Sequence, residues 1–185
     1  MKFFAHSDMT GRHAFLSASK YHWIRYDEDK LYETFLNAMD AALGTRLHAF
    51  AAEAILLKQR MPENNATLNA YVNDAIGFRM TPEVMLVASE NAFGTADAIS
   101  FYDNILRIHD LKNGVSPAKM DQLLIYACFF LIEYGFKPNE IKIVLRIYQN
   151  DDIVEFIPDI TDLAPIIDQI LIFDELIKQW KVQSR

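Results

Sequence analysis

The chain has little cysteine: Cys128 is the single thiol among its 185 residues. One thiol cannot form a disulfide within the chain, and it cannot supply the four thiolates of a structural zinc or iron–sulfur site. Because Cys128 lies in an apolar run of helical character, we expect it to act as a small hydrophobic residue of the core. This cysteine usage fits a cytoplasmic protein.

Long hydrophobic segments are also missing. The longest uncharged apolar run, 123–132, has ten residues, whereas a membrane-spanning helix needs roughly 20. The opening Met1-Lys-Phe-Phe lacks the longer apolar stretch and the cleavage site of a signal peptide. We therefore expect no membrane association.

Positive charge is the minority charge. Eighteen lysines and arginines stand against 25 aspartates and glutamates, for a net charge of −7. This balance argues against non-specific binding to nucleic acid through charge alone. It does not exclude a site where carboxylates gather around a metal, because the bound ion neutralises part of their charge.

The pattern of apolar residues and turn signals predicts alternating groups of helices and strands. We expect helices at 30–39, 46–59, 65–76, 116–134 and 162–180, and strands at 83–89, 91–102, 105–111, 140–149 and 153–157. This order predicts one mixed α/β domain over 1–185, with a central mixed β-sheet flanked by helices.

Short signals fix several of these boundaries. Gly44-Thr45 separates the first two helices, and Asp103-Asn104 joins two strands into a hairpin. Ser116-Pro117 is typical of a helix start, and Gly135 of a helix end. In the same way, the serines of Leu16-Ser-Ala-Ser19 are expected to cap a helix at 20–23.

The segment Asp110-Leu-Lys112 carries the clearest chemical signal. Side chains two apart on a strand point the same way, so Asp110 and Lys112 should lie side by side. A carboxylate there can hold a hard cation, and an ammonium can position a water or neutralise developing negative charge. The alternative is a surface ion pair of little energetic value.

Two further side chains could join this pair. Asp97 lies in a strand of small and apolar residues, where a carboxylate is costly to bury unless it is paired or binds a metal. His48 follows a helix start, and a neutral imidazole can ligate a metal without adding charge. The alternatives are an aspartate paired with an arginine and a histidine with a structural hydrogen bond.

Four segments in order carry a family resemblance. They are Gly44-Thr-Arg-Leu-His48, Gly94-Thr-Ala-Asp97, Asp110-Leu-Lys112 and Gln122-Leu-Leu-Ile-Tyr126. Together they resemble the PD-(D/E)XK nuclease superfamily, in particular its RecB-like exonuclease branch. That branch shows G-T-x-x-H, G-x-x-D, D/E-x-K and Q-x-x-x-Y in this order. The resemblance spans roughly residues 14–150 and implies a restriction-endonuclease-like core.

The resemblance also implies an activity and a site. His48, Asp97, Asp110 and the backbone carbonyl of Leu111 would hold Mg²⁺ or Mn²⁺. Lys112 would complete the catalytic set with Asp110 and Asp97, by orienting a water or stabilising the transition state. The expected reaction is hydrolysis of DNA phosphodiester bonds, with exonuclease action as the implied mode.

Seven other residues are candidates for supporting roles. Gln122 and Tyr126 lie four apart on one helix face and would line the site and bind substrate, or else cap a helix and pack in the core. The helix start at Ser116 could receive a phosphate. Arg46 and Lys119 could contact phosphates, and Glu53 and Glu90 could support the metal ligands; the alternative for all four is a solvated face.

The chain lacks the iron–sulfur cysteines and helicase segments of some relatives of this branch. It therefore resembles a bare nuclease core of the kind found in phage and mobile-element genomes, acting in DNA recombination, repair or processing. DNA is the expected partner, with a homo-oligomer or a recombination or replication protein as further possibilities. Two alternatives stay open: a catalytically silent nuclease-fold module used for binding or assembly, and a nuclease of RNA or branched substrates.

Overall fold

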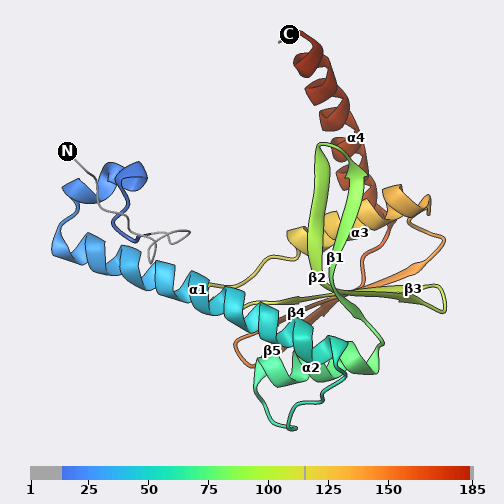
Figure 1. Cartoon of the computed structure of the whole chain (residues 1–185). Coiled ribbons are helices and arrows are strands. Elements are labelled where there is room, and N and C mark those ends of the chain that lie inside the picture. Colours follow the sequence, from blue (N-terminus) through green and yellow to red (C-terminus); the bar gives the residue numbers. More distant parts are fainter. Residues whose placement is uncertain (1–13, 115, 184–185) are drawn as a thin grey trace, which may run out of the picture. The chain divides into compact units, whose positions relative to one another are not determined.

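The computed structural model describes residues 14–114 and 116–183 (Figure 1). The chain divides into two compact units, Met1–Leu43 and Gly44–Arg185. The first contains the 3₁₀ helix η2 (Ala18–Arg25) and the beginning of the long helix α1 (Glu28–Leu56). Within this unit Trp23 Nε1 donates to the carbonyl of Ser17 over 2.9 Å, and the rings of Phe15 and Phe35 meet edge to face.

Two predictions near the start of the chain are wrong in detail. Among the described residues Ser17 precedes η2 without donating or accepting a side-chain capping hydrogen bond, so the predicted serine cap does not form. The predicted break at Gly44-Thr45 is also absent, because α1 runs unbroken through both residues. A glycine inside a helix costs only about 1 kcal/mol relative to alanine, which the strong helix formers around it overcome.

The second unit contains a five-stranded mixed sheet. Its strands are β1 (Thr81–Ser89), β2 (Ala92–Tyr102), β3 (Ile105–Leu111), β4 (Lys142–Gln149) and β5 (Asp152–Phe156), in that spatial order. All neighbouring pairs are antiparallel except β3 and β4, which are parallel. The parallel pair requires a crossover, and helix α3 (Asp121–Tyr134) supplies it.

Helices cover both faces of this sheet. On one face, α3 and α4 (Ile160–Gln183) pack over a core that includes Leu123, Leu163 and Leu145. On the other, α2 (Thr67–Gly77) and the last part of α1 enclose a smaller core. Figure 1 shows α2 and α3 on opposite sides of the strands. The predicted mixed α/β class, a central mixed sheet flanked by helices, is therefore confirmed.

The start of α3 differs from the prediction, and its end does not. Ser116 and Pro117 lie in a loop, and the helix begins at Asp121. Gln149 from β4 explains the delay, since its side chain donates to the carbonyl of Ser116 and accepts from the amide of Ala118. Gly135 ends the helix in the left-handed conformation, with φ of +72°, as predicted.

No helix in the described ranges combines the length and apolar character that a membrane crossing requires.

Candidate metal centre

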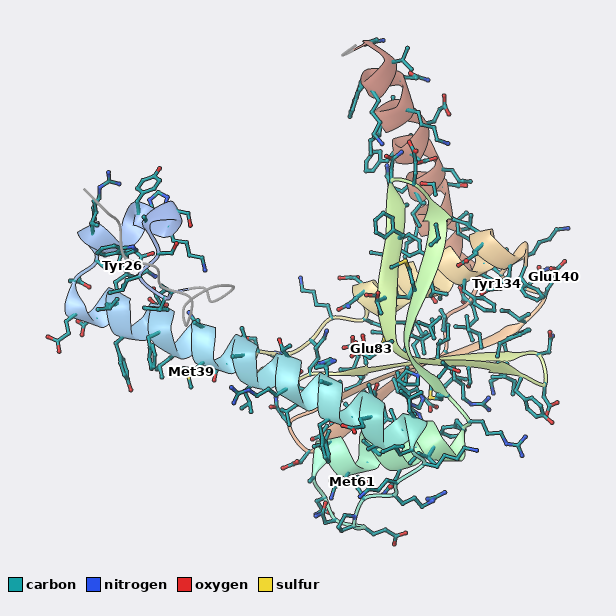
Figure 2. The ribbon with its side chains drawn as sticks, in the orientation of Figure 1. Tyr26, Met39, Met61, Glu83, Tyr134 and Glu140 are labelled. Carbon is teal, nitrogen blue, oxygen red and sulfur yellow. The ribbon has the colours of Figure 1, made fainter. Side chains whose placement is uncertain are left out.

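Three elements of the second unit bring His48, Glu83 and Asp97 together. His48 lies on α1, Glu83 on β1 and Asp97 on β2. The Nδ1 atom of His48 is 3.3 Å from Oδ2 of Asp97. One ligand atom from each of the three residues lies within 4.8 Å of the others, a spacing that a single metal ion can bridge. Figure 2 marks Glu83 beside the strands that carry the site.

Asp97 lies where the face alternation of β2 breaks. Ala96 packs in the core under α3, yet Ala98 packs in the core under α2. Residues two apart on a regular strand share a face, so the strand must turn locally at Asp97. The β1–β2 hairpin bends away from β3–β5 in Figure 1. This bend frees Asp97 to turn its carboxylate toward the end of β3, where Oδ2 accepts the amide hydrogen of Leu111 over 3.0 Å.

Asp110 and Lys112 lie side by side at the end of β3, as the strand periodicity predicts. The Lys112 ammonium is 3.0 Å from Oδ2 of Asp110. This contact is an ion pair without hydrogen-bond geometry, because neither carboxylate oxygen of Asp110 has a hydrogen-bond partner among the described residues. Asp110 is only 1% exposed, so these oxygens do not gain compensation from bulk water.

The pKa shifts around the cluster show crowded negative charge. Burial, and then the nearby Asp97 carboxylate, raises the pKa of Asp110 to about 6. Burial and Asp97 also raise the pKa of Glu83. The hydrogen bond to Asp97 raises the pKa of His48, which favours its positive form. The Asp97 carboxylate thus acts on both Asp110 and Glu83, and a divalent cation beside Asp97 would relieve this repulsion.

Helix α3 holds the lysine from the other side. The Lys112 ammonium donates to Oε1 of Gln122 over 2.9 Å, and Nε2 of Gln122 donates to the Tyr126 hydroxyl over 3.2 Å. The predicted pair on one helix face is therefore a chain of hydrogen bonds that ends on Lys112. Gln122 and Tyr126 therefore fix the position of the Lys112 ammonium.

Two glycines of the motifs allow close packing. A Cβ atom on Gly94 would lie 2.9 Å from the ring of Tyr126, and a Cβ on Gly44 would lie 2.9 Å from the Asn113 side-chain oxygen. Real Cβ atoms essentially never make such contacts. Glycine at position 94 lets β2 approach the Tyr126 ring of α3, whereas at position 44 the neighbouring atoms are the end of the Asn113 side chain, which can move aside more easily.

The remaining predicted residues lie outside this cluster of contacts. Glu90 is in the β1–β2 turn rather than on the strand with Asp97, and it pairs with Lys181 of α4 at 3.2 Å. Glu53 and Arg46 are exposed on α1, and Lys119 is exposed in the loop before α3. Pairwise contacts connect His48, Asp97, Asp110, Lys112, Gln122 and Tyr126, and the amide of Leu111 links Asp97 to the end of β3. In the described part of the chain, the ligand atoms within 4.8 Å of one another belong to His48, Glu83 and Asp97, and Asp110 is outside that group.

Glu83 is the member of the cluster that sequence reasoning missed. Pro82 pairs with Ala98 and Val84 with Ala96, so Glu83 is opposite Asp97 in the hairpin. Pairing the two strands around a two-residue turn at Glu90-Asn91, with Ser89 opposite Ala92, would set residue 84 and not residue 83 against residue 97. The missing information was the register shift between Val87 and Ser89, which moves Glu83 into the position opposite Asp97.

Comparisons with known proteins add little. No family model matches the chain, and no curated protein matches it. A solved structure described as "Crystal structure of SSO0001" is similar over 84% of this chain and 68% of that one, with 16% sequence identity and a TM-score of 0.37. A similarity of this strength carries no argument about fold or function.

Proposed function

We propose that this protein is a Mg²⁺- or Mn²⁺-dependent deoxyribonuclease of the PD-(D/E)XK type, with exonuclease action as the mode that its motifs imply. One observation supports this most: His48, Asp97, Asp110 and Lys112, spread over 65 positions of the sequence, meet around the end of β3. Each comes from a different one of the motifs that suggested the family, except the paired Asp110 and Lys112.

The residues present fit a hard divalent cation. Carboxylate oxygens and one imidazole nitrogen suit Mg²⁺ and Mn²⁺, and the oxygens of Asp110 are buried without hydrogen-bond donors from the described chain. His48, Asp97, Asp110 and the Leu111 carbonyl would hold the ion. When bound, such an ion lowers the pKa of a coordinated water and polarises the phosphoryl group.

Lys112 supplies the positive charge that the reaction needs from the protein. Its ammonium is fixed between Asp110 and Gln122, so its direction is set before substrate arrives. There it can donate to the attacking water or to a phosphate oxygen, where negative charge grows in the transition state. Water attacks phosphorus in line, the bond to the 3′ oxygen breaks, and the 5′ phosphate stays on the product, as the resemblance implies.

The size and acidity of the domain bear on how it would act on DNA. A small acidic domain encloses little DNA by itself, so processive action would need an oligomer or a recombination or replication partner. We also propose a role in phage or mobile-element DNA recombination, repair or processing, as the resemblance implies.

The test is cleavage of linear and circular DNA, single- and double-stranded, with Mn²⁺, Mg²⁺ or EDTA. We expect metal-dependent loss of linear DNA, abolished by EDTA and by Lys112→Ala. A matched control is Lys178→Ala, which removes the lysine of another aspartate–lysine pair, Asp174–Lys178, joined at 2.7 Å within α4. Cleavage of circles would indicate an endonuclease. No cleavage with any metal would overturn the proposal in favour of a silent binding module.

A further inference from the structure

We propose that Glu83 is a metal ligand of this site, one that the four motifs do not include. Together with His48 and Asp97 it would hold a divalent cation on the hairpin side of the cluster. The inference rests on the proposed metal-dependent function, and it adds a ligand from β1, a strand that carries none of the recognised motifs.

The first argument is the position of Glu83 on the sheet. It is opposite Asp97 in the antiparallel pairing of β1 and β2. Like charges at directly opposite positions of a sheet repel and destabilise it. The two carboxylates nevertheless both reach the imidazole of His48, with ligand atoms of all three residues within 4.8 Å. An arrangement that repels when empty becomes favourable when a cation lies between the carboxylates.

The second argument is the backbone of Glu83. Its φ is +53°, inside a strand. Glycine and asparagine adopt this left-handed region readily, whereas other residues do so at a cost. Glutamate is therefore an unfavourable choice for the conformation of the chain at this position. The fold nevertheless holds the Glu83 side chain beside His48 and Asp97, and a third ligand for the cation is a contribution that would offset this cost.

The third argument comes from a different residue. Asp110, 1% exposed, presents two carboxylate oxygens without hydrogen-bond partners in the described part of the chain. Its charge acts on His48, and the amide of the next residue, Leu111, donates to Asp97. This carboxylate, whose charged neighbour is the Lys112 ammonium, is therefore near the His48–Glu83–Asp97 group. Its buried oxygens, without hydrogen-bond donors from the described residues, independently indicate that a further positively charged ligand belongs there.

The ligand chemistry favours Mn²⁺ as the probe. One imidazole nitrogen with carboxylate oxygens suits Mn²⁺ well and leaves room for water or a phosphate oxygen. Losing even an outer-sphere partner of a metal ligand weakens affinity 10–100-fold. Removing the negative charge of Glu83 should therefore weaken Mn²⁺ binding by about tenfold or more.

The experiment is titration calorimetry of the whole chain with Mn²⁺ alone, supported by the electron paramagnetic resonance of free Mn²⁺. We compare wild type with Glu83→Gln, and we use Glu90→Gln as the matched control, because Glu90 is on the same hairpin but pairs with Lys181. We expect about tenfold weaker binding for Glu83→Gln and unchanged binding for Glu90→Gln. Equal affinity of wild type and Glu83→Gln would overturn the inference and leave the proposed function standing. Absence of Mn²⁺ binding by wild type would overturn both.

A second variant separates metal binding from folding. Glu83→Asn suits the positive φ and removes the charge, so the metal-free protein should melt at the wild-type temperature or above it. The same variant should bind Mn²⁺ about tenfold more weakly. Lower melting temperature with unchanged Mn²⁺ affinity would assign Glu83 a structural role and contradict the inference.

Discussion

Two aspartate–lysine pairs in the second unit look alike and behave in opposite ways. Asp110 and Lys112 are 3.0 Å apart, and Asp174 and Lys178 are 2.7 Å apart. Both aspartates are largely buried, with 1% and 8% exposure. Yet the pKa of Asp110 is raised to about 6, and that of Asp174 is lowered to about 2.

The difference is in what surrounds each carboxylate besides its lysine. Asp174 accepts hydrogen bonds from the Ser89 hydroxyl at 2.6 Å and from the Asn91 amide at 2.8 Å. Asp110 accepts none from the described residues, and the charge of Asp97 acts on it. A nearby lysine alone is therefore not enough to stabilise the ionised form of a buried carboxylate. The hydrogen bonds and the ion pair of Asp174 satisfy its carboxylate and connect α4 to the end of β1 and the β1–β2 turn. Within the described ranges, the Asp110 carboxylate has only the Lys112 ion pair, and a bound cation would supply further positive charge.

The largest expected effect concerns catalysis. Lys112→Ala should lower DNA cleavage by about 10³-fold, close to 4 kcal/mol of barrier, which is the scale of losing one preorganised charge. Lys178→Ala should leave the rate unchanged. Single-turnover cleavage of linear DNA with Mn²⁺ measures both. Equal loss in the two variants would show that the two pairs do not differ in function.

The next largest effect is the stabilisation by Mn²⁺, which should depend on Asp110 and not on Asp174. Mn²⁺ at 100 times its dissociation constant should stabilise the wild-type protein by about 2.7 kcal/mol, because the ion binds only the folded state. Asp110→Asn should lose most of this gain, and Asp174→Asn should keep it. Thermal melting with and without Mn²⁺ gives the comparison. A full Mn²⁺ response in Asp110→Asn would remove Asp110 from the ligand set.

The two aspartates should also respond oppositely to pH in metal-free protein. The pKa of Asp110 in the folded state, about 6, exceeds its ordinary 3.8. Its contribution to stability is therefore fully present below about pH 4 and is lost as pH rises through 6. Asp110→Asn should escape this loss and be more stable than wild type at pH 8 by about 3 kcal/mol.

The contribution of Asp174 to stability changes with pH in the opposite direction. Its folded-state pKa of about 2 is below the ordinary 3.8. The stability that it contributes is present above about pH 4 and is lost as pH falls through 2. Asp174→Asn should therefore destabilise the protein at neutral pH and should flatten its loss of stability in acid. Urea unfolding between pH 3 and 8 tests both variants, and shifts of the same sign would contradict the comparison.

The smallest expected effect concerns packing behind Lys112. Gly94→Ala should cost about 1–2 kcal/mol of stability, since the new Cβ would lie 2.9 Å from the Tyr126 ring. Displacing Tyr126 should also loosen Gln122 and reduce cleavage several-fold. Gly77→Ala is the control, because a Cβ there meets no atom of the described chain within 4 Å. Equal stability of the two variants would show that the close approach at Gly94 is not required.

Local signals predicted much of the fold. The turn at Asp103-Asn104 joins β2 and β3 as expected, with positive φ at both residues, and Gly135 ends α3. These features depend on a few adjacent residues. The start of α3 was mispredicted because Gln149, more than 30 residues away, holds the loop before it.

In the site too, features set by adjacent residues were predicted, and features set by long-range contacts were not. The periodicity of a strand was enough to place Asp110 beside Lys112. Glu83 was not predicted, since its approach to Asp97 depends on strand register and on a positive φ that no local pattern indicates. The hydrogen-bond chain from Tyr126 through Gln122 to Lys112 likewise depends on how α3 packs over the sheet. Long-range packing decides which of the candidate residues meet.

The most direct test of the central claim is an anomalous difference map from crystals soaked in Mn²⁺. The account predicts a strong peak within bonding distance, about 2.0–2.3 Å, of His48, Asp97 and Asp110. It predicts no peak at Asp174, whose oxygens are already bonded to Ser89, Asn91 and Lys178. An empty map at His48 and Asp97 under saturating Mn²⁺ would contradict the account.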